Sequence, residues 1–342
     1  MMPELPPFYF PTCTVLVDDE FSFLSNFSLS LDSRLAFRLF DSARRALACV
    51  EAQRQEAAAV EGYFSPISNT TELNPDHVIQ VNLPRLYQEI YNPRRFSEIS
   101  VALVDYAMPE MNGLEFCRHI RRHHIKTILL TGKADEKVAV EAFNEGLIDR
   151  FIFKSEGDVG RRVNQAIDEL QRVYFQEKCA PLARALTAHA LPYLRDERFG
   201  ELFTRLQEQY QWVEYYLLDC PRGFLLLDQH GRTMLLIVTL PEDLRTHYEI
   251  AQDEQAPAAL LEVLAQGHHI PFFQTTDGYY QQGYESWRSD LRPAEIFRGT
   301  NTYVYAVIPN PPLAYLHLEG VRSYRDFLRQ LDAESDLAAA QS

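Results

Sequence analysis

The sequence predicts an α/β domain with a doubly wound, five-stranded parallel sheet, followed by a long linking helix and an α+β domain with an antiparallel sheet. Three observations support this fold class. Short apolar runs alternate with helical patterns through the first half of the 342 residues. An apolar repeat of nearly three and a half residues begins near residue 158. Short strand-like runs separated by turn sequences follow it, which is typical of an antiparallel meander.

Five apolar runs in the first half are the predicted strands of the parallel sheet. Each is short enough for a strand and precedes a helical pattern or a turn, as expected when helices cover both faces of a sheet. The predicted strands are 13–17, 35–40, 99–104, 127–130 and 151–153, and the predicted helices include 41–54, 113–122 and 134–145.

Residues 55–97 interrupt this alternation. They contain the turn signals Ser65-Pro66, Asn74-Pro75 and Asn92-Pro93, with a helical spacing of apolar residues between them. We interpret this segment as an insertion with its own loop and helix. A connection of this length in a compact domain is expected to be functional or mobile.

Polar side chains follow four of the predicted strands. Asp18 and Asp19 come after the first strand, Asp105 after the third, Thr131 after the fourth and Lys154 after the fifth. Open α/β sheets bind their ligands beyond the carboxyl ends of their strands. Three acids gathered there repel one another unless a metal ion or a lysine is present, so we expect both.

In this order, the motifs make the first half resemble the receiver domain of two-component response regulators, a flavodoxin-like fold. The resemblance rests on Asp-Asp-Glu at 18–20, Asp-x-x-Met-Pro-x-Met-Asn-Gly from Asp105, Leu-Leu-Thr ending at Thr131 and Phe-Ile-Phe-Lys ending at Lys154. It implies a receiver domain over 11–157, with the insertion inside it. It also implies a phosphorelay in which a sensor histidine kinase or a histidine phosphotransfer protein is the phosphodonor.

The resemblance assigns a role to each motif. Asp105 would be the nucleophile that accepts the phosphoryl group. Asp18 and Asp19 would hold Mg²⁺ together with Asp105 and the backbone carbonyl of Ala107, because Mg²⁺ prefers oxygen ligands and keeps several waters.

Lys154 and Thr131 would contact the phosphoryl group, and Thr131 and Phe151 would transmit the signal. Lys154 would place its charge on a phosphoryl oxygen, and the Thr131 hydroxyl would turn toward the same group. Phe151, three residues before the lysine, would then pack into the vacated space as a two-state switch. One departure affects this end of the site: Ser155 follows the lysine where the family usually has a proline in a cis peptide, so the loop is expected to be arranged differently.

The helical pattern over 158–190 is longer than one needed to cover the sheet. Its apolar seam could pack on the sheet or between two chains, so both a covering helix and a linker or dimer helix remain open. Pro181 is expected to end or kink it. We expect a homodimer.

The second half predicts an α+β output domain over 191–332 and a flexible tail over 333–342. The Gly-Phe-Leu-Leu-Leu-Asp-Gln-His-Gly-Arg stretch at 223–232 is weakly similar to PAS-type domains. Three outputs compete: binding of a downstream protein or small ligand, an enzyme switched by the receiver, and a DNA-binding regulator. The overall layout also resembles quorum-sensing response regulators with non-standard outputs.

Composition disfavours the DNA-binding output and a membrane partner. The formal net charge is −15, and the chain beyond residue 190 has no lysine and more acids than arginines. The five cysteines are widely spaced and odd in number, which indicates neither a zinc site nor a disulfide framework. No signal peptide or membrane-spanning run is predicted, and a cytoplasmic, non-enzymatic signalling protein is expected.

Overall fold

The chain forms two compact units, each assembled from separate segments. The computed structural model describes residues 5–54, 60–66, 79–132, 135–155, 157–187, 191–276, 278–312, 316, 318 and 320–340. The parallel-sheet unit contains Phe10–Ala59, Asn92–Lys178 and Tyr324–Ser342. The antiparallel-sheet unit contains Met1–Tyr9, Val60–Tyr91 and Cys179–Ser323.

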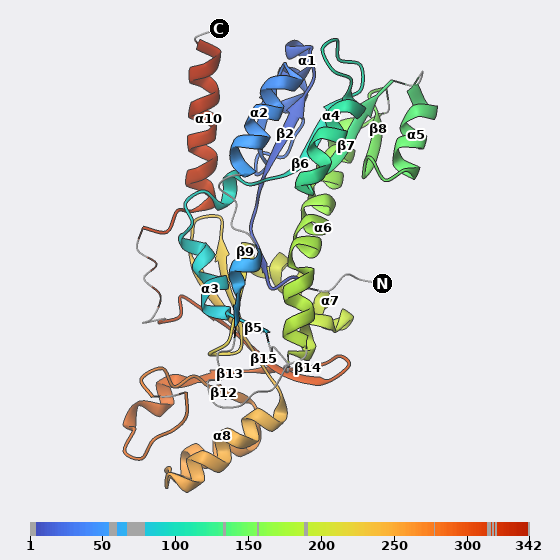
Figure 1. Cartoon of the computed structure of the whole chain (residues 1–342). Coiled ribbons are helices and arrows are strands. Elements are labelled where there is room, and N and C mark those ends of the chain that lie inside the picture. Colours follow the sequence, from blue (N-terminus) through green and yellow to red (C-terminus); the bar gives the residue numbers. More distant parts are fainter. Residues whose placement is uncertain are drawn as a thin grey trace. The chain divides into compact units, whose positions relative to one another are not determined.

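Five parallel strands form the centre of the parallel-sheet unit, in the order β3-β2-β6-β7-β8 (Figure 1). The predicted α/β class with a five-stranded parallel sheet is therefore confirmed. Residues of the central strands are buried along their whole length, because helices cover both faces of such a sheet. The strands are β2 Cys13–Val17, β3 Ala36–Phe40, β6 Ile99–Asp105, β7 Lys126–Thr131 and β8 Arg150–Phe153.

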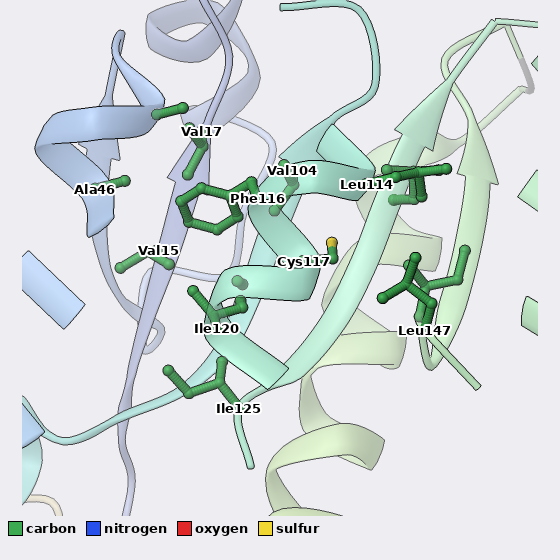
Figure 2. Close-up of a cluster of buried hydrophobic side chains, with 14 of the residues drawn as sticks. Val15, Val17, Ala46, Val104, Leu114, Phe116, Cys117, Ile120, Ile125 and Leu147 are labelled. Carbon is green, nitrogen blue, oxygen red and sulfur yellow. The ribbon is translucent and has the colours of Figure 1, made fainter. Parts of the chain in front are cut away.

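Helices divide between the two faces of this sheet. On one face, α2 (Ala43–Arg54), α4 (Gly113–Ile120) and α5 (Glu136–Asn144) pack over the strands. Figure 2 shows Phe116 and Cys117 of α4 lying against side chains of β2 and β6. On the other face, α1 (Phe21–Ser28) and the first half of α6 (Val159–Thr187) share a second core cluster.

The start of α4 is fixed by its own sequence. Asn112 accepts a hydrogen bond from the Glu115 backbone N–H at 2.9 Å, and the Glu115 carboxylate accepts one from the Asn112 backbone N–H at 3.3 Å. This capping box satisfies two backbone donors that the first turn would leave unpaired. It therefore sets where the loop that follows Asp105 ends.

The helix α10, Tyr324–Ala340, belongs to the parallel-sheet unit. Its Tyr324 hydroxyl donates to the carbonyl of Arg34 at 2.7 Å and accepts from the backbone N–H of Ala36 at 3.1 Å. The rings of Tyr324 and Phe327 also contact Phe96, whose side chain is fully buried. The helix extends to Ala340, and the flexibility expected over 333–342 stays a prediction.

Six antiparallel strands form the main sheet of the other unit, in the order β1-β9-β10-β11-β15-β14. A core of aromatic rings from α7 (Glu197–Tyr210) and the sheet packs on one side, including Phe199, Phe203 and Phe224. The predicted antiparallel sheet is confirmed, and the similarity to PAS-type domains stays a prediction. The strands are β1 Phe8–Tyr9, β9 Trp212–Leu218, β10 Gly223–Asp228, β11 Thr233–Thr239, β14 Glu295–Arg298 and β15 Thr302–Pro309.

A second, smaller core lies in the same unit between α8 (Pro241–Asp253), α9 (Ala258–Gln266) and the segment that follows them. Tyr280 and Trp287 are buried in it. Two short strands close this part, β12 His269–Pro271 and β13 Leu291–Pro293.

Part of the predicted insertion belongs to the antiparallel-sheet unit. The segment includes β4 Phe64–Pro66, β5 Ile79–Val81 and α3 Leu83–Tyr87, and α3 contacts β9. Tyr63 donates its hydroxyl to Glu89 at 3.0 Å, and its ring lies 5.7 Å from that of Phe8. The segment therefore differs from the expected insertion inside a contiguous receiver domain. Residues 55–59 and 67–78 of the predicted insertion lie outside the described residues.

The long helix does not end at Pro181, and the alternative prediction of a kink there stays a prediction. It continues through this proline to Thr187, because Leu182, Ala183 and Leu186 are buried and hold the last turns in place. Short 3₁₀ helices complete the described elements, at Val60–Tyr63, Gln88–Tyr91, Arg95–Ser97, Arg121–His123, Pro192–Arg195 and Glu285–Asp290. Of the helices that the structure describes, none combines the length and the apolar character needed to cross a membrane.

Candidate functional site

The acidic residues singled out in the sequence come together at the carboxyl end of the parallel sheet. Asp18 and Asp19 follow β2, and Asp105 is the last residue of β6, which pairs directly with β2. The chain leaves β2 toward β3 on one side and places β6 on the other, so the strand order reverses here. Ligand sites of open α/β sheets lie at this kind of switch point.

Three carboxylates form a compact cluster. One oxygen from each of Asp18, Asp19 and Asp105 can be chosen so that all three lie within 4.8 Å of one another. Asp18 and Asp105 are buried and Asp19 is exposed. Backbone N–H groups fix the two buried carboxylates: Glu20 donates to Asp18 Oδ1 at 2.9 Å, and Ala107 donates to Asp105 Oδ2 at 3.0 Å.

Lys154 bridges the two buried carboxylates. Its Nζ lies 2.7 Å from Asp18 Oδ2 and 2.8 Å from Asp105 Oδ1. Its backbone N–H donates to the carbonyl of Thr131 at 2.9 Å, which ties the loop after β8 to the end of β7. Among the described residues the cis peptide bond is Cys220–Pro221, so the bond between Lys154 and Ser155 is trans and the lysine reaches the site without the usual proline.

Burial and charge act against each other on these groups. Burial raises the pKa of Asp105, the hydrogen bond and charge of Lys154 oppose that rise, and the neighbouring charge of Asp18 adds to it. Burial alone would lower the pKa of Lys154, but its hydrogen bonds and ion pairs with Asp105 and Asp18 outweigh this, and the pKa stands above its ordinary value. The ammonium is therefore firmly protonated.

The donor set fits a hard divalent cation. Three carboxylates against one ammonium leave a net charge of −2 at the cluster, and carboxylate oxygens are the ligands that Mg²⁺ prefers. The exposed side of the cluster, at Asp19, leaves room for the waters that Mg²⁺ keeps. Ala107 is also exposed, two residues beyond Asp105.

Thr131 and Phe151 lie on neighbouring strands, with different surroundings. Thr131 ends β7, is buried, and donates its hydroxyl to the carbonyl of Gly132 at 3.3 Å. The Phe151 ring packs edge-on against Phe143 at 6.1 Å and Phe153 at 5.6 Å. Thr131 faces Phe153 in the strand register, and Phe151 faces Leu129.

Two residues of the site received no role in the sequence analysis: Gly113, which ends the quoted motif, and Phe23, which was missed. A Cβ added at Gly113 would lie 2.3 Å from the carbonyl oxygen of Asp105, so the loop that leaves Asp105 returns too closely for any side chain there. The Lys154 Nζ lies 4.2 Å from the centroid of the Phe23 ring. The position of Phe23, four residues after Asp19 in a helix that begins beside the site, is a signal that could have identified it.

Comparisons with known proteins agree with this fold. The family described as "Response regulator receiver domain" matches residues 68–161, a range that contains Asp105, Thr131 and Lys154. A comparison with curated proteins finds no match.

Among solved structures, the Legionella pneumophila response regulator LqsR is 41% identical, with a TM-score of 0.80 over 96% of this chain and 97% of that one. A CheY-like response regulator receiver domain protein from Methanospirillum hungatei JF-1 is 19% identical, with a TM-score of 0.31 over 49% of this chain and 98% of that one.

Proposed function

The chain belongs to the response regulators that carry a receiver domain, and on this premise we propose that Asp105 accepts a phosphoryl group from a histidine kinase or a histidine phosphotransfer protein. The observation that carries the proposal is the Lys154 ammonium held between the Asp105 and Asp18 carboxylates, beside a third acid. This arrangement supplies a nucleophile, a fixed positive charge and a cation site within one cluster.

In the proposed reaction, a carboxylate oxygen of Asp105 attacks phosphorus as the P–N bond to the donor imidazole breaks. The released imidazole nitrogen takes a proton from solvent, and an acyl phosphate forms on Asp105. Lys154 moves from Asp105 Oδ1 to a phosphoryl oxygen and keeps its contact with Asp18. Mg²⁺, held by Asp18, Asp19, Asp105 and the Ala107 carbonyl, would neutralise the phosphoryl charge when bound.

Labelling with radioactive acetyl phosphate and Mg²⁺ tests the proposal. We expect the wild-type chain to take up one acid-stable, hydroxylamine-sensitive label, and Asp105→Asn to lose it because the amide is not a nucleophile. Asp228→Asn is the matched control, since Asp228 is a buried carboxylate in the other unit. Chelating the metal should also abolish the label. Undiminished labelling of Asp105→Asn would contradict the proposal.

We further propose that the Thr131 hydroxyl turns toward the phosphoryl group and that Phe151 then packs closer to it. The hydroxyl holds one weak contact, to Gly132, so little opposes its rotation. Phe151 is half-buried between two rings. Fluorine NMR of a labelled Phe151 with and without beryllofluoride is the corresponding measurement, and an unchanged signal would contradict the switch.

For the output we propose binding of a downstream protein or a small ligand in a cytoplasmic signalling pathway, as in the quorum-sensing regulators that the layout resembles. The acidic composition supports this output over nucleic-acid binding. A pull-down with and without beryllofluoride is the test: a phosphorylation-dependent protein or metabolite supports it, whereas recovered DNA or turnover of a nucleotide would support the other two outputs.

Homodimerisation also remains a proposal. Val163, Ile167 and Leu170, in the first half of α6, are buried on the parallel sheet. A dimer formed through this helix would therefore use its extension past residue 170. We expect light scattering to give a larger mass in the presence of beryllofluoride and Mg²⁺, and a monomer at every concentration in both states would contradict dimerisation.

A further inference from the structure

The third partner of Lys154 is an aromatic ring. Besides the carboxylates of Asp18 and Asp105, the ammonium faces the ring of Phe23, with Nζ 4.2 Å from the ring centroid. At this distance the negative face of the ring attracts the cation. Lys154 is thus held by two charged groups and one neutral group.

The ring is itself held in place by packing. Phe23 lies in α1 and stacks on Phe27, with centroids 5.5 Å apart and an interplanar angle of 11°. Both rings pack against the buried cluster that contains Leu24 and the first residues of α6. Since α1 begins directly after the acidic pair, the helix that follows Asp19 also positions the ring over the lysine.

The ring differs from the carboxylates in what happens to it during the proposed reaction. Conversion of Asp105 to an acyl phosphate moves the negative charge from its carboxylate to the phosphoryl oxygens, and a bound cation competes for the same carboxylates. Phe23 is neutral, binds no metal and is not consumed, so its attraction for the ammonium persists through every step.

We propose that Phe23 is a positioning residue that keeps the Lys154 ammonium beside Asp105 while the carboxylate contacts are exchanged for a phosphoryl oxygen. This inference rests on the proposed phosphorylation of Asp105. It assigns the phosphoryl-accepting site an additional member from α1, which acts through Lys154 and does not touch the phosphoryl group.

A graded fluorination of the ring tests the proposal in the full chain. Replacing Phe23 by mono-, di- and trifluorophenylalanine weakens the negative face stepwise and keeps the shape of the side chain. We expect the initial rate of Asp105 labelling by acetyl phosphate to fall stepwise, by about fivefold at the end of the series, as loss of about 1 kcal/mol of attraction predicts. The fall should lie in the maximal rate rather than in the KM for acetyl phosphate.

A second readout follows Lys154 directly. A ring over the lysine end shifts its ε-methylene protons upfield in NMR spectra, so Phe23→Leu should remove this shift and Phe23→Tyr should retain both the shift and the labelling rate. The same fluorinated residues at Phe27 are the control. That ring shares the apolar surroundings of Phe23, but the lysine faces the ring of Phe23, so fluorination at Phe27 should leave the labelling rate within twofold.

Three outcomes would decide against the proposal. A labelling rate that is flat across the fluorinated series, an equal fall from fluorination at Phe27, or Lys154 methylene shifts that are unchanged in Phe23→Leu would each overturn it. Failure of the proposed function is separate: a wild-type chain that takes no label overturns phosphorylation of Asp105, while the Lys154 shifts still decide whether Phe23 positions the lysine.

Discussion

Replacing Phe327 by alanine is expected to lower the free energy of unfolding by about 3 to 5 kcal/mol, the range for a large buried side chain reduced to a methyl group. Phe327 is 3% exposed, and its ring lies 5.7 Å from that of the fully buried Phe96. Ending the chain after Ser323 removes Tyr324 and Leu331 as well, which are also buried. At about 1.5 to 3 kcal/mol for each buried side chain, the loss approaches the whole stability of a typical domain.

Hydrogen exchange measured on the full chain and on both variants locates the effect. We expect amides of β2, β3 and β6 to lose protection in Phe327→Ala and to exchange fully in the shortened chain. Phe143→Ala is the matched control, since Phe143 belongs to the same unit and is 47% exposed. If it lowers stability as much as Phe327→Ala, the packing of α10 does not explain the result.

Two tyrosine hydroxyls, that of Tyr324 in α10 and that of Tyr193 in the other unit, test what a buried hydroxyl contributes to stability. In Tyr324→Phe the buried N–H of Ala36 loses its partner, which should cost about 1 to 3 kcal/mol. The hydroxyl of Tyr193 is buried with no hydrogen-bond partner among the described residues. Tyr193→Phe is therefore expected to leave the stability unchanged or to raise it.

Gly113→Ala is expected to disturb both the stability and the phosphorylation of the receiver. The added methyl group would lie 2.3 Å from the carbonyl oxygen of Asp105 and 3.0 Å from the side chain of Leu129, and the nearer atom is backbone in a central strand. The loop must move, at a cost of about 1 to 3 kcal/mol. Because that loop holds the Asp105 carboxylate through the Ala107 N–H, the initial rate of labelling should fall as well.

Urea unfolding and labelling with acetyl phosphate are the measurements for this variant. Gly200→Ala is the control, because Gly200 lies inside α7 and an added Cβ there meets nothing within 4 Å. It should raise the free energy of unfolding by up to about 1 kcal/mol. Wild-type labelling and stability in Gly113→Ala would show that the loop tolerates a side chain.

The sequence predicted the parallel sheet well because local signals define it. Strand β2 has its predicted bounds. The predicted bounds of β3, β6 and β8 differ from the observed ones by one residue at one end, and those of β7 by one residue at both ends. Each strand is a mostly apolar run, and the acids, Thr131 and Lys154 of the site lie at or just beyond the ends of four of them. The cluster of Asp18, Asp105 and Lys154 then follows from the parallel arrangement, which brings these ends to one edge.

The features that the sequence did not predict have either a weak local pattern or contacts between residues far apart in the chain. The two residues of β1 are too few for a periodic pattern, and their strand exists through pairing with β9. Helix α8 was missed since its apolar pattern is sparse, with Leu244 and Ala251 as its buried residues. The contact of Phe23 with Lys154 joins residues far apart in the chain, so neither residue alone indicates it.

The division of the chain between its units limits how this regulator can be recombined. Unit boundaries fall after residues 9, 59, 91, 178 and 323, so the polypeptide passes from one unit to the other five times. No single cut yields a complete receiver, and no simple fusion would attach this receiver to a foreign output. A receiver joined by one linker can be exchanged as a module. Here each unit is assembled from three separate segments of the chain, so an exchange would have to replace all three.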